Sequence, residues 1–285
     1  MKQLLVLSGK GGTGKTTVSS ALIKLTGCKA FADCDVDAPN LHLVTKIKNI
    51  PKEAEYYGLD KAWIDKELCI NCGLCSESCR FNAIIKEDKY KVNKLACEGC
   101  GVCEYVCPVN AINMKKNTAG KIYLYNDEDI FFSSAQLEMG NGTTGMLVSR
   151  VKKQLTDLTE DIELAIIDGS PGIGCPVIAS ISGVDAVLVV AEPSISGISD
   201  MERIIATAKG FGVIIMVCVN KYDTNLENTE KIIEYCKDNK ISFVGMIPFD
   251  AEAVKAVNEG VSIVDRDCIS GKAVREIHSK VIDSM

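Results

Sequence analysis

The chain has 285 residues, of which 47% are hydrophobic and 25% are charged, as in an ordinary soluble globular protein with one large domain or two modest ones. The formal net charge of −6 argues against a surface that neutralises nucleic-acid phosphates. No targeting stretch is visible and no apolar run approaches the roughly 20 residues that span a bilayer, so we expect a cytoplasmic protein with neither a nucleic-acid nor a membrane partner. Fourteen cysteines are better interpreted as metal ligands than as disulfides in such a chain.

The first predicted elements flank a glycine-rich loop. Residues 4–7 are an apolar run expected to form a buried parallel strand, and residues 17–25 have helical spacing. Between them the sequence GKGGTGKT fits the phosphate-loop pattern GxxxxGK[ST], whose backbone N–H groups hold phosphates at a helix start. Lys15 would neutralise the β- and γ-phosphates, and the Thr16 hydroxyl would bind Mg²⁺. The predicted nucleotide-binding residues here are Gly9, Lys10, Gly11, Gly12, Thr13, Gly14, Lys15, Thr16 and Thr17.

A second lysine, Lys10, follows the first glycine of this loop. The segment KGGTGKT thereby resembles the deviant phosphate loop of the family that contains MinD, ParA and the nitrogenase iron protein. In that family the lysine reaches the nucleotide of the opposite subunit. The resemblance implies an ATP-dependent homodimer in which Lys10 acts in trans; the alternative is a solvated loop cation.

An acidic segment follows the next predicted strand, residues 28–32. Asp33, Asp35 and Asp37 lie where a strand beside a phosphate loop ends, which is where a metal ion and an attacking water are held. The segment is similar to switch I of the same family. The resemblance implies that Asp35 positions the water and that Asp33 and Asp37 are metal-shell or structural acids. The alternative is an acidic turn in which Asp33 caps a helix.

An internal repeat begins after a junction at residues 51–63. Residues 69–79 read CINCGLCSESC, and residues 97–107, which follow 28 positions later, read CEGCGVCEYVC. Each copy has the CxxCxxCxxxC spacing in which three thiolates bind one cubane cluster and the fourth binds the neighbouring cluster. This predicts two [4Fe–4S] clusters, one held by Cys69, Cys72, Cys75 and Cys107 and the other by Cys97, Cys100, Cys103 and Cys79. Residues 62–116 resemble a two-cluster bacterial ferredoxin; two zinc knuckles are the alternative.

The chain then returns to the parent domain through expected strands at residues 121–132, a turn at 140–145 and a helix at 146–158. The apolar strand 164–168 ends in Asp168, ahead of a glycine-rich turn. This pattern resembles Walker B followed by switch II and implies that Asp168 lies beside Mg²⁺. Cys175 lies seven residues after Asp168, the offset at which the nitrogenase iron protein has a cysteine of its bridging cluster. Because no partner cysteine is evident near Gly140, a buried or partner-facing thiol is the favoured interpretation.

The remaining sequence alternates strands and helices. Strands are expected at 186–191, 213–219 and 243–247, and helices at 200–208, 226–238, 252–258 and 271–282. Such alternation predicts a mostly parallel sheet covered on both faces. The sequence Asn220-Lys221-Tyr222-Asp223 matches the guanine motif NKxD, whereas in the MinD-like family the equivalent asparagine reads adenine, with Pro248 and Asp250 near the same ring. The family resemblance favours adenine.

Nearly the whole chain resembles MinD-superfamily ATPases of the SIMIBI type that carry an inserted ferredoxin domain. The expected architecture is an α/β P-loop ATPase formed by residues 1–58 and 119–285, with an α+β ferredoxin-like insert at residues 59–118. The expected catalytic residues are Lys10, Lys15, Asp35 and Asp168, and the expected Mg²⁺ ligands are Thr16, Asp33, Asp35 and Asp168.

Three functions fit these motifs. The first is an ATPase that couples nucleotide state to electron transfer through the two clusters, dimerises on ATP and docks a redox or metallocofactor protein. The second is an iron–sulfur assembly or carrier ATPase of the Mrp type, although no CxxC occurs outside the ferredoxin repeat. The third, a positioning ATPase with structural clusters, is the least favoured because of the acidic charge balance.

Overall fold

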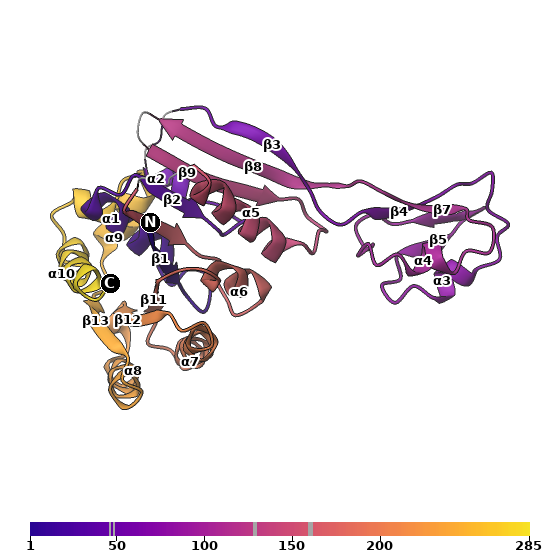
Figure 1. Cartoon of the computed structure of the whole chain (residues 1–285). Coiled ribbons are helices and arrows are strands. Elements are labelled where there is room, and N and C mark those ends of the chain that lie inside the picture. Colours follow the sequence, from indigo (N-terminus) through magenta and orange to yellow (C-terminus); the bar gives the residue numbers. More distant parts are fainter. Residues whose placement is uncertain (46, 48, 128–129, 159–161) are drawn as a thin grey trace. The chain divides into compact units, whose positions relative to one another are not determined.

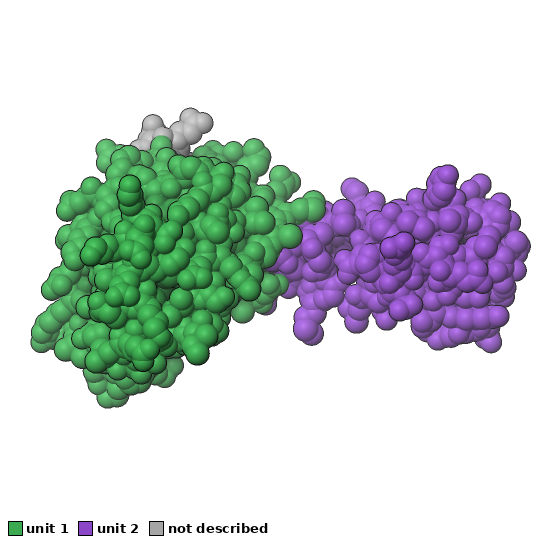
Figure 2. All heavy atoms as spheres, turned by 90° about the horizontal axis from the view of Figure 1, so that it is seen from below, with its two compact units in different colours: residues 1–52, 123–135, 145–285 green, residues 53–122, 136–144 purple. Residues whose placement is uncertain are grey.

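The computed structural model describes residues 1–45, 47, 49–127, 130–158 and 162–285. The chain divides into two compact units, coloured separately in Figure 2. The first comprises Met1–Lys52, Tyr123–Ala135 and Gly145–Met285, and the second comprises Glu53–Ile122 and Gln136–Thr144. The second unit therefore extends beyond the insert expected at 59–118, because the strands that enter and leave it contribute their ends to it and a separate nine-residue segment joins it.

A nine-stranded sheet has the order β13-β12-β11-β1-β10-β2-β9-β8-β3 (Figure 1). All pairings from β13 through β9 are parallel; for example, Leu4 of β1 is opposite Ile166 of β10 and Ala186 of β11. The strands are β1 (Lys2–Leu7), β2 (Ala30–Asp33), β3 (Lys52–Tyr57), β8 (Thr118–Asp127), β9 (Ile130–Leu137), β10 (Leu164–Asp168), β11 (Ala186–Ala191), β12 (Ile214–Asn220) and β13 (Ser242–Ile247).

The apolar runs of the sequence occupy the middle of this sheet. Every side chain from Leu4 to Leu7 is fully buried, as are those from Ala186 to Val190. Strands that are buried on both faces read as continuous apolar runs, which explains why these two were recognisable. Because neighbouring strands are parallel, the loops that follow β1, β2, β10 and β12 leave the sheet at the same edge, where parallel α/β sheets place their ligand sites.

Helices cover the sheet and connect its strands (Figure 1). In the first unit, α10 packs on α1 and β13, and α7 packs on β11. Several starts are capped by side chains: Ser194 accepts from the N–H of Gly197 at α7, and Asn225 accepts from that of Asn228 at α8. The helices are α1 (Lys15–Thr26), α2 (Leu41–Thr45), α5 (Thr144–Thr156), α6 (Cys175–Ile181), α7 (Ile195–Lys209), α8 (Leu226–Asp238), α9 (Ala251–Asn258) and α10 (Ile269–Asp283), with 3-10 turns at Tyr222–Thr224 and Ile263–Asp265. No described helix is both long and apolar enough to cross a bilayer.

The second unit contains two small antiparallel pairs and two helical turns. Strand β4 (Lys61–Ile64) pairs with β7 (Ile112–Lys115), and β5 (Ile84–Lys86) pairs with β6 (Tyr90–Val92). The turns α3 (Leu74–Glu77) and α4 (Val102–Tyr105) lie within the two cysteine repeats. The unit has its own apolar cluster, in which aliphatic side chains of β4, β5 and β7 pack against cysteines of both repeats. A core so small and so rich in cysteine is typical of domains stabilised by bound metal.

Candidate functional site

The phosphate loop connects β1 to α1 in the first unit. Gly12 and Gly14 have φ angles of 78° and 95°, which favour glycine, and a Cβ on Gly14 would lie 2.2 Å from Nδ2 of Asn220. The loop lines a cavity of about 510 Å³ to which Lys10, Lys15, Thr16 and Thr17 contribute, together with Asp35 and Asn40 from the acidic segment. The structure therefore brings the predicted phosphate-binding residues other than Gly9 and Thr13, and the predicted water-positioning carboxylate, to one cavity.

A buried polar cluster lies at the start of α1. Asp168, at the end of β10, is fully buried; its Oδ1 is 2.8 Å from Lys15 Nζ, and its Oδ2 accepts a 2.7 Å hydrogen bond from Thr16 Oγ1. Burial alone would lower the pKa of Lys15, but the carboxylates of Asp168, Asp33 and Asp35 together outweigh it and the pKa is raised. Ser19, one turn further along α1, also donates to Asp168 at 2.7 Å. Its only sequence signal is the four-residue spacing from Lys15, and it was not predicted.

Asp33 has a different role from Asp35. Asp33 is fully buried and accepts hydrogen bonds from the backbone N–H groups of Asp35, Asn40 and Leu41 at 2.9–3.0 Å. Burial and the negative charge of Asp168 raise the pKa of Asp33 to about 7. Asp33 thus fixes the shape of the acidic segment and the start of α2, whereas Asp35 lines the phosphate cavity. Mg²⁺ prefers oxygen ligands, and the hydroxyl of Thr16 with the carboxylates of Asp35 and Asp168 supplies such a donor set.

Lys10 does not point freely into solvent. Its Nζ lies 3.0 Å from a carboxylate oxygen of Glu192 and donates to Ser194 Oγ at 3.3 Å, at the start of α7. The Lys10 side chain remains 38% exposed. We call this arrangement the Lys10 latch. Glu192 directly follows β11 and was not predicted, because the segment after this strand matched none of the nucleotide-binding motifs.

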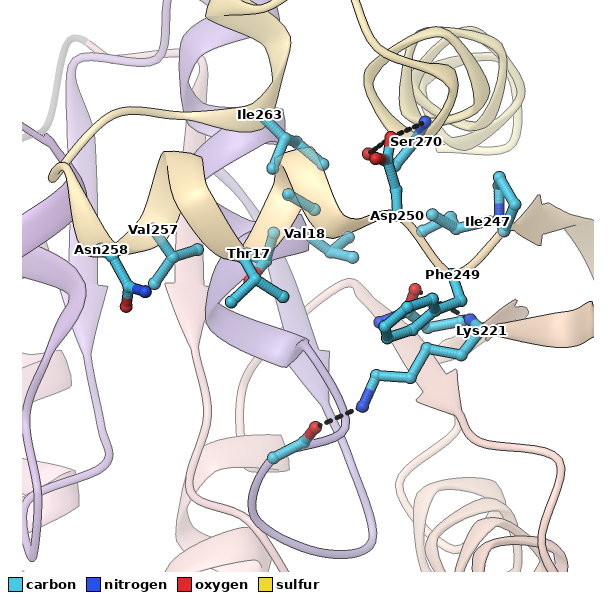
Figure 3. Close-up of a pocket in the computed structure, with 15 residues that line it drawn as sticks. Thr17, Val18, Lys221, Ile247, Phe249, Asp250, Val257, Asn258, Ile263 and Ser270 are labelled. Atoms are coloured by element: carbon cyan, nitrogen blue, oxygen red, sulfur yellow. Dashed lines mark hydrogen bonds between the residues drawn. The ribbon is translucent and has the colours of Figure 1, made fainter. Parts of the chain in front are cut away.

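A second cavity of about 240 Å³ adjoins the first, since Gly12, Thr17 and Val257 line both (Figure 3). It contains the three residues predicted to lie near the base, Asn220, Pro248 and Asp250, together with Phe249.

Two of its residues brace the phosphate loop. Asn220 Nδ2 donates to the carbonyl of Thr13 at 2.7 Å. Lys221 Nζ donates to the carbonyl of Gly12 at 3.1 Å (Figure 3). Asp250 caps α9 and accepts from Ser270 of α10, and Asp223 accepts from the N–H of Phe249. The aspartate of the NKxD pattern is thus engaged with the chain itself, and Lys221 is a loop-bracing residue not singled out from the sequence.

The eight repeat cysteines of the second unit surround two small cavities. One is lined by Cys69, Cys72, Cys75 and Cys107, and the other by Cys79, Cys97, Cys100 and Cys103. These are the two ligand sets that the spacing predicts, including the exchange of the fourth cysteine between repeats. Burial raises the pKa of Cys75, and it raises that of its repeat equivalent Cys103 to about 11.

The sequence repeat is also a repeat of backbone geometry. Gly73 and Gly101, which are equivalent positions, have φ angles of 89° and 75°. The Ala83 N–H donates to Cys79 Sγ at 3.4 Å, and the Ala111 N–H donates to Cys107 Sγ at 3.2 Å. Hydrogen bonds to sulfur and a largely apolar lining are the features by which proteins tune iron–sulfur clusters, so the donor set and its surroundings fit such a group. Within the described ranges, no three His, Cys, Asp or Glu side chains form a group suited to a single metal ion.

The other cysteines lie in the first unit. Cys34, Cys218, Cys236 and Cys268 are buried, Cys28 is half-buried, and Cys175 is exposed at the start of α6.

The chain is similar to several known proteins. The model of the CobQ/CobB/MinD/ParA nucleotide binding domain matches residues 4–263. The uncharacterized protein MJ0578 of Methanocaldococcus jannaschii is 33% identical over 285 residues, covering 98% of this chain and 96% of its own length. The iron-sulfur cluster carrier protein of the same organism is 21% identical, covering 99% and 84%. Among solved structures, the cell division ATPase MinD of Pyrococcus furiosus has a TM-score of 0.59 at 18% identity, covering 100% of this chain and 99% of that one. At this identity the likeness concerns the fold.

Proposed function

The chain belongs to the CobQ/CobB/MinD/ParA family of nucleotide-binding proteins, and from this premise we propose that it hydrolyses ATP and couples its nucleotide state to electron transfer through two [4Fe–4S] clusters. The observation that carries the proposal is the arrangement of eight cysteines as two sets of four, each around its own cavity, in a chain that also has a complete phosphate-loop cavity.

The nucleotide half of the proposal assigns roles to residues of the phosphate cavity. Backbone N–H groups of the loop and Lys15 bind the phosphates, while Thr16 and Asp168 hold Mg²⁺, which would neutralise charge on the β- and γ-phosphates. Asp35 orients the attacking water. Lys10 leaves Glu192 and reaches the nucleotide of a second copy, which makes ATP binding and dimer formation one event. The base occupies the cavity beside Asn220, and adenine is the proposed base.

The electron-transfer half assigns Cys69, Cys72, Cys75 and Cys107 to one cluster and Cys79, Cys97, Cys100 and Cys103 to the other. When bound, each cluster supplies a one-electron redox couple. The protein provides the thiolates, the N–H donors of Ala83 and Ala111, and apolar cover from residues such as Ile64 and Ile84.

The insertion point supports coupling between the two halves. The acidic segment ends at Leu41, and the chain leaves the first unit eleven residues later, after Lys52. Segments that contact the γ-phosphate and its Mg²⁺ change shape on hydrolysis in phosphate-loop proteins. A coupling free energy of roughly 1–3 kcal/mol would shift a one-electron potential by roughly 40–130 mV.

The test is an anaerobic redox titration, followed by electron paramagnetic resonance, of the reconstituted protein. Midpoint potentials are measured without nucleotide, with MgADP and with a non-hydrolysable MgATP analogue. We expect the analogue to shift at least one midpoint, and we expect no shift in the Lys15→Ala variant, which cannot hold the phosphates. Identical midpoints in all three states would refute the coupling.

A second candidate, an iron–sulfur carrier, is favoured by the similarity to the iron-sulfur cluster carrier protein of Methanocaldococcus jannaschii. The two functions differ in the fate of the iron. A carrier loses its clusters to an apo-protein acceptor in an ATP-dependent manner, whereas an electron carrier retains about eight iron atoms per chain through repeated cycles of reduction and oxidation.

A further inference from the structure

The two cysteine cavities differ at one equivalent position of the repeat. Ile70, the residue after Cys69, lines the first cavity, and Glu98, the residue after Cys97, lines the second. Among the described residues that line these two cavities, Glu98 is the only carboxylate. Both side chains are exposed at the cavity rim.

The two cavities share other features of the repeat. Each receives one N–H···S bond at the same repeat position, and each has a left-handed glycine in the same place, Gly73 or Gly101. Adding an electron to a cluster increases its negative charge, so a nearby carboxylate disfavours the reduced state. An isoleucine at the equivalent position has no such effect.

The Glu98 carboxylate lies against the segment Gln136–Thr144 of the same unit. A Cβ built on Gly142 would be 2.8 Å from Glu98 Oε2. Buried Lys61 ties this segment to the loop before Cys97, because its Nζ donates to the carbonyls of Gly140 at 3.1 Å and Lys94 at 3.0 Å. The position of the carboxylate therefore depends on the path of residues 140–142.

That segment continues directly into α5, which packs on α6 within the first unit. A Cβ on Gly145 would be 3.3 Å from the carbonyl oxygen of Cys175, and Lys152 Nζ donates to the carbonyl of Ser180 at 2.6 Å. Helix α6 follows the glycine-rich turn after Asp168. Only Thr143 thus separates Gly142 from α5, and α5 packs on the helix that follows the glycine-rich turn after Asp168.

We propose that the Glu98 carboxylate holds the cluster of Cys79, Cys97, Cys100 and Cys103 at a lower reduction potential than the other cluster. The segment through Gly142 sets the distance between this carboxylate and the cluster. Electrons then pass from the cluster beside Glu98 to the cluster beside Ile70. This inference rests on the proposed function, because it requires both clusters.

The experiment compares midpoint potentials in the reconstituted full-length protein by the same redox titration. Glu98→Gln should raise the lower midpoint and leave the upper one unchanged. For an exposed, screened carboxylate we expect about a threefold change in the reduced-to-oxidised ratio at fixed potential, about 28 mV at 59 mV per tenfold. The reciprocal variant Ile70→Glu should lower the upper midpoint by a similar amount. Glu87→Gln, outside both cavities, is the charge-matched control.

Gly142→Ala tests the role of the segment without changing any charge. It should displace the Glu98 carboxylate and move the lower midpoint in the parent protein, but have no effect in the Glu98→Gln background. The shifts should shrink as salt is raised from about 0.01 M to about 1 M, because the Debye length falls from about 30 Å to about 3 Å.

The outcomes distinguish failure of this inference from failure of the proposed function. Unchanged midpoints in Glu98→Gln, or an equal shift in Glu87→Gln, overturn the role of Glu98 while two clusters remain. A Glu98 shift without any nucleotide dependence supports Glu98 and refutes the proposed coupling. Failure of the protein to hold two clusters overturns both.

Discussion

The Lys10 latch gives a quantitative prediction for dimer formation. For Lys10 to reach a second subunit, its contact with Glu192 must first break, and the variant Glu192→Gln removes the charge that opposes this step. The pair is 3.0 Å apart, with Lys10 38% and Glu192 24% exposed. Pairs exposed to this degree are worth about 0.2–1 kcal/mol.

Formation of a symmetric dimer breaks two Lys10–Glu192 pairs. Glu192→Gln should therefore stabilise the dimer by about 0.4–2 kcal/mol, which lowers its dissociation constant about 2- to 30-fold. The assay is sedimentation of Glu192→Gln and its parent with MgATP, both in an Asp35→Asn background, in which the proposed role of Asp35 predicts slow hydrolysis. Glu230→Gln, an exposed carboxylate of α8, controls for the change in net charge.

Two results would refute this reasoning. An unchanged dissociation constant would mean that the latch does not oppose dimer formation, and a weaker dimer would mean that Glu192 stabilises the assembled form. Dimers of Glu192→Gln without nucleotide would separate dimer formation from ATP binding, contrary to the proposed role of Lys10.

Three further results are expected. Thr16→Ala removes a hydroxyl that lies 2.7 Å from Asp168. It should lower ATP turnover in a phosphate-release assay at least about 100-fold, which corresponds to about 2.7 kcal/mol in activation free energy, and raise the Mg²⁺ requirement. Turnover within a factor of three of the parent would contradict the role of Thr16 as a ligand. Phe132→Ala removes a fully buried ring that stacks on two other aromatic rings. It should lower the free energy of unfolding by about 3–5 kcal/mol and the calorimetric melting temperature by about 6–20 °C. A fall below 2 °C would show that neighbouring side chains move in and fill the cavity. Cys103→Ser should reduce bound iron from about eight to about four atoms per chain, whereas exposed Cys175→Ser should not change it; equal iron contents would disprove the ligand assignment.

The sequence predicted the parts of the molecule whose chemistry depends on residue spacing. Local patterns predicted the phosphate loop and the apolar strands β1, β10 and β11. The cysteine repeat predicted two sets of four cysteines, each with three from one repeat and one from the other. These features are recognisable because a glycine-rich turn, a doubly buried strand and a repeated cysteine motif each restrict the residues that can occupy them.

Other elements carried no such restriction. Strand β3 has the largely polar sequence KEAEYY at the edge of the sheet, so it lacks an apolar alternation and was expected to be a junction. Helix α6 has only seven residues, too few to show a helical period. The loop-bracing role of Lys221 and the contact of Ser19 with Asp168 depend on tertiary proximity between segments distant in sequence.

The ion pair between Lys15 and Asp168 implies that metal and nucleotide enter together. Without ligand, each group serves as the other's counter-ion in a buried site. A phosphate that arrives alone attracts Lys15 away and leaves the Asp168 carboxylate uncompensated, which is unfavourable in a buried environment. Under the proposed role of Asp168, a magnesium ion that arrives with the phosphate would replace the lost positive charge there. If Lys15 and Asp168 have their proposed roles, replacing both partners at once would favour the Mg²⁺–nucleotide complex over either component alone.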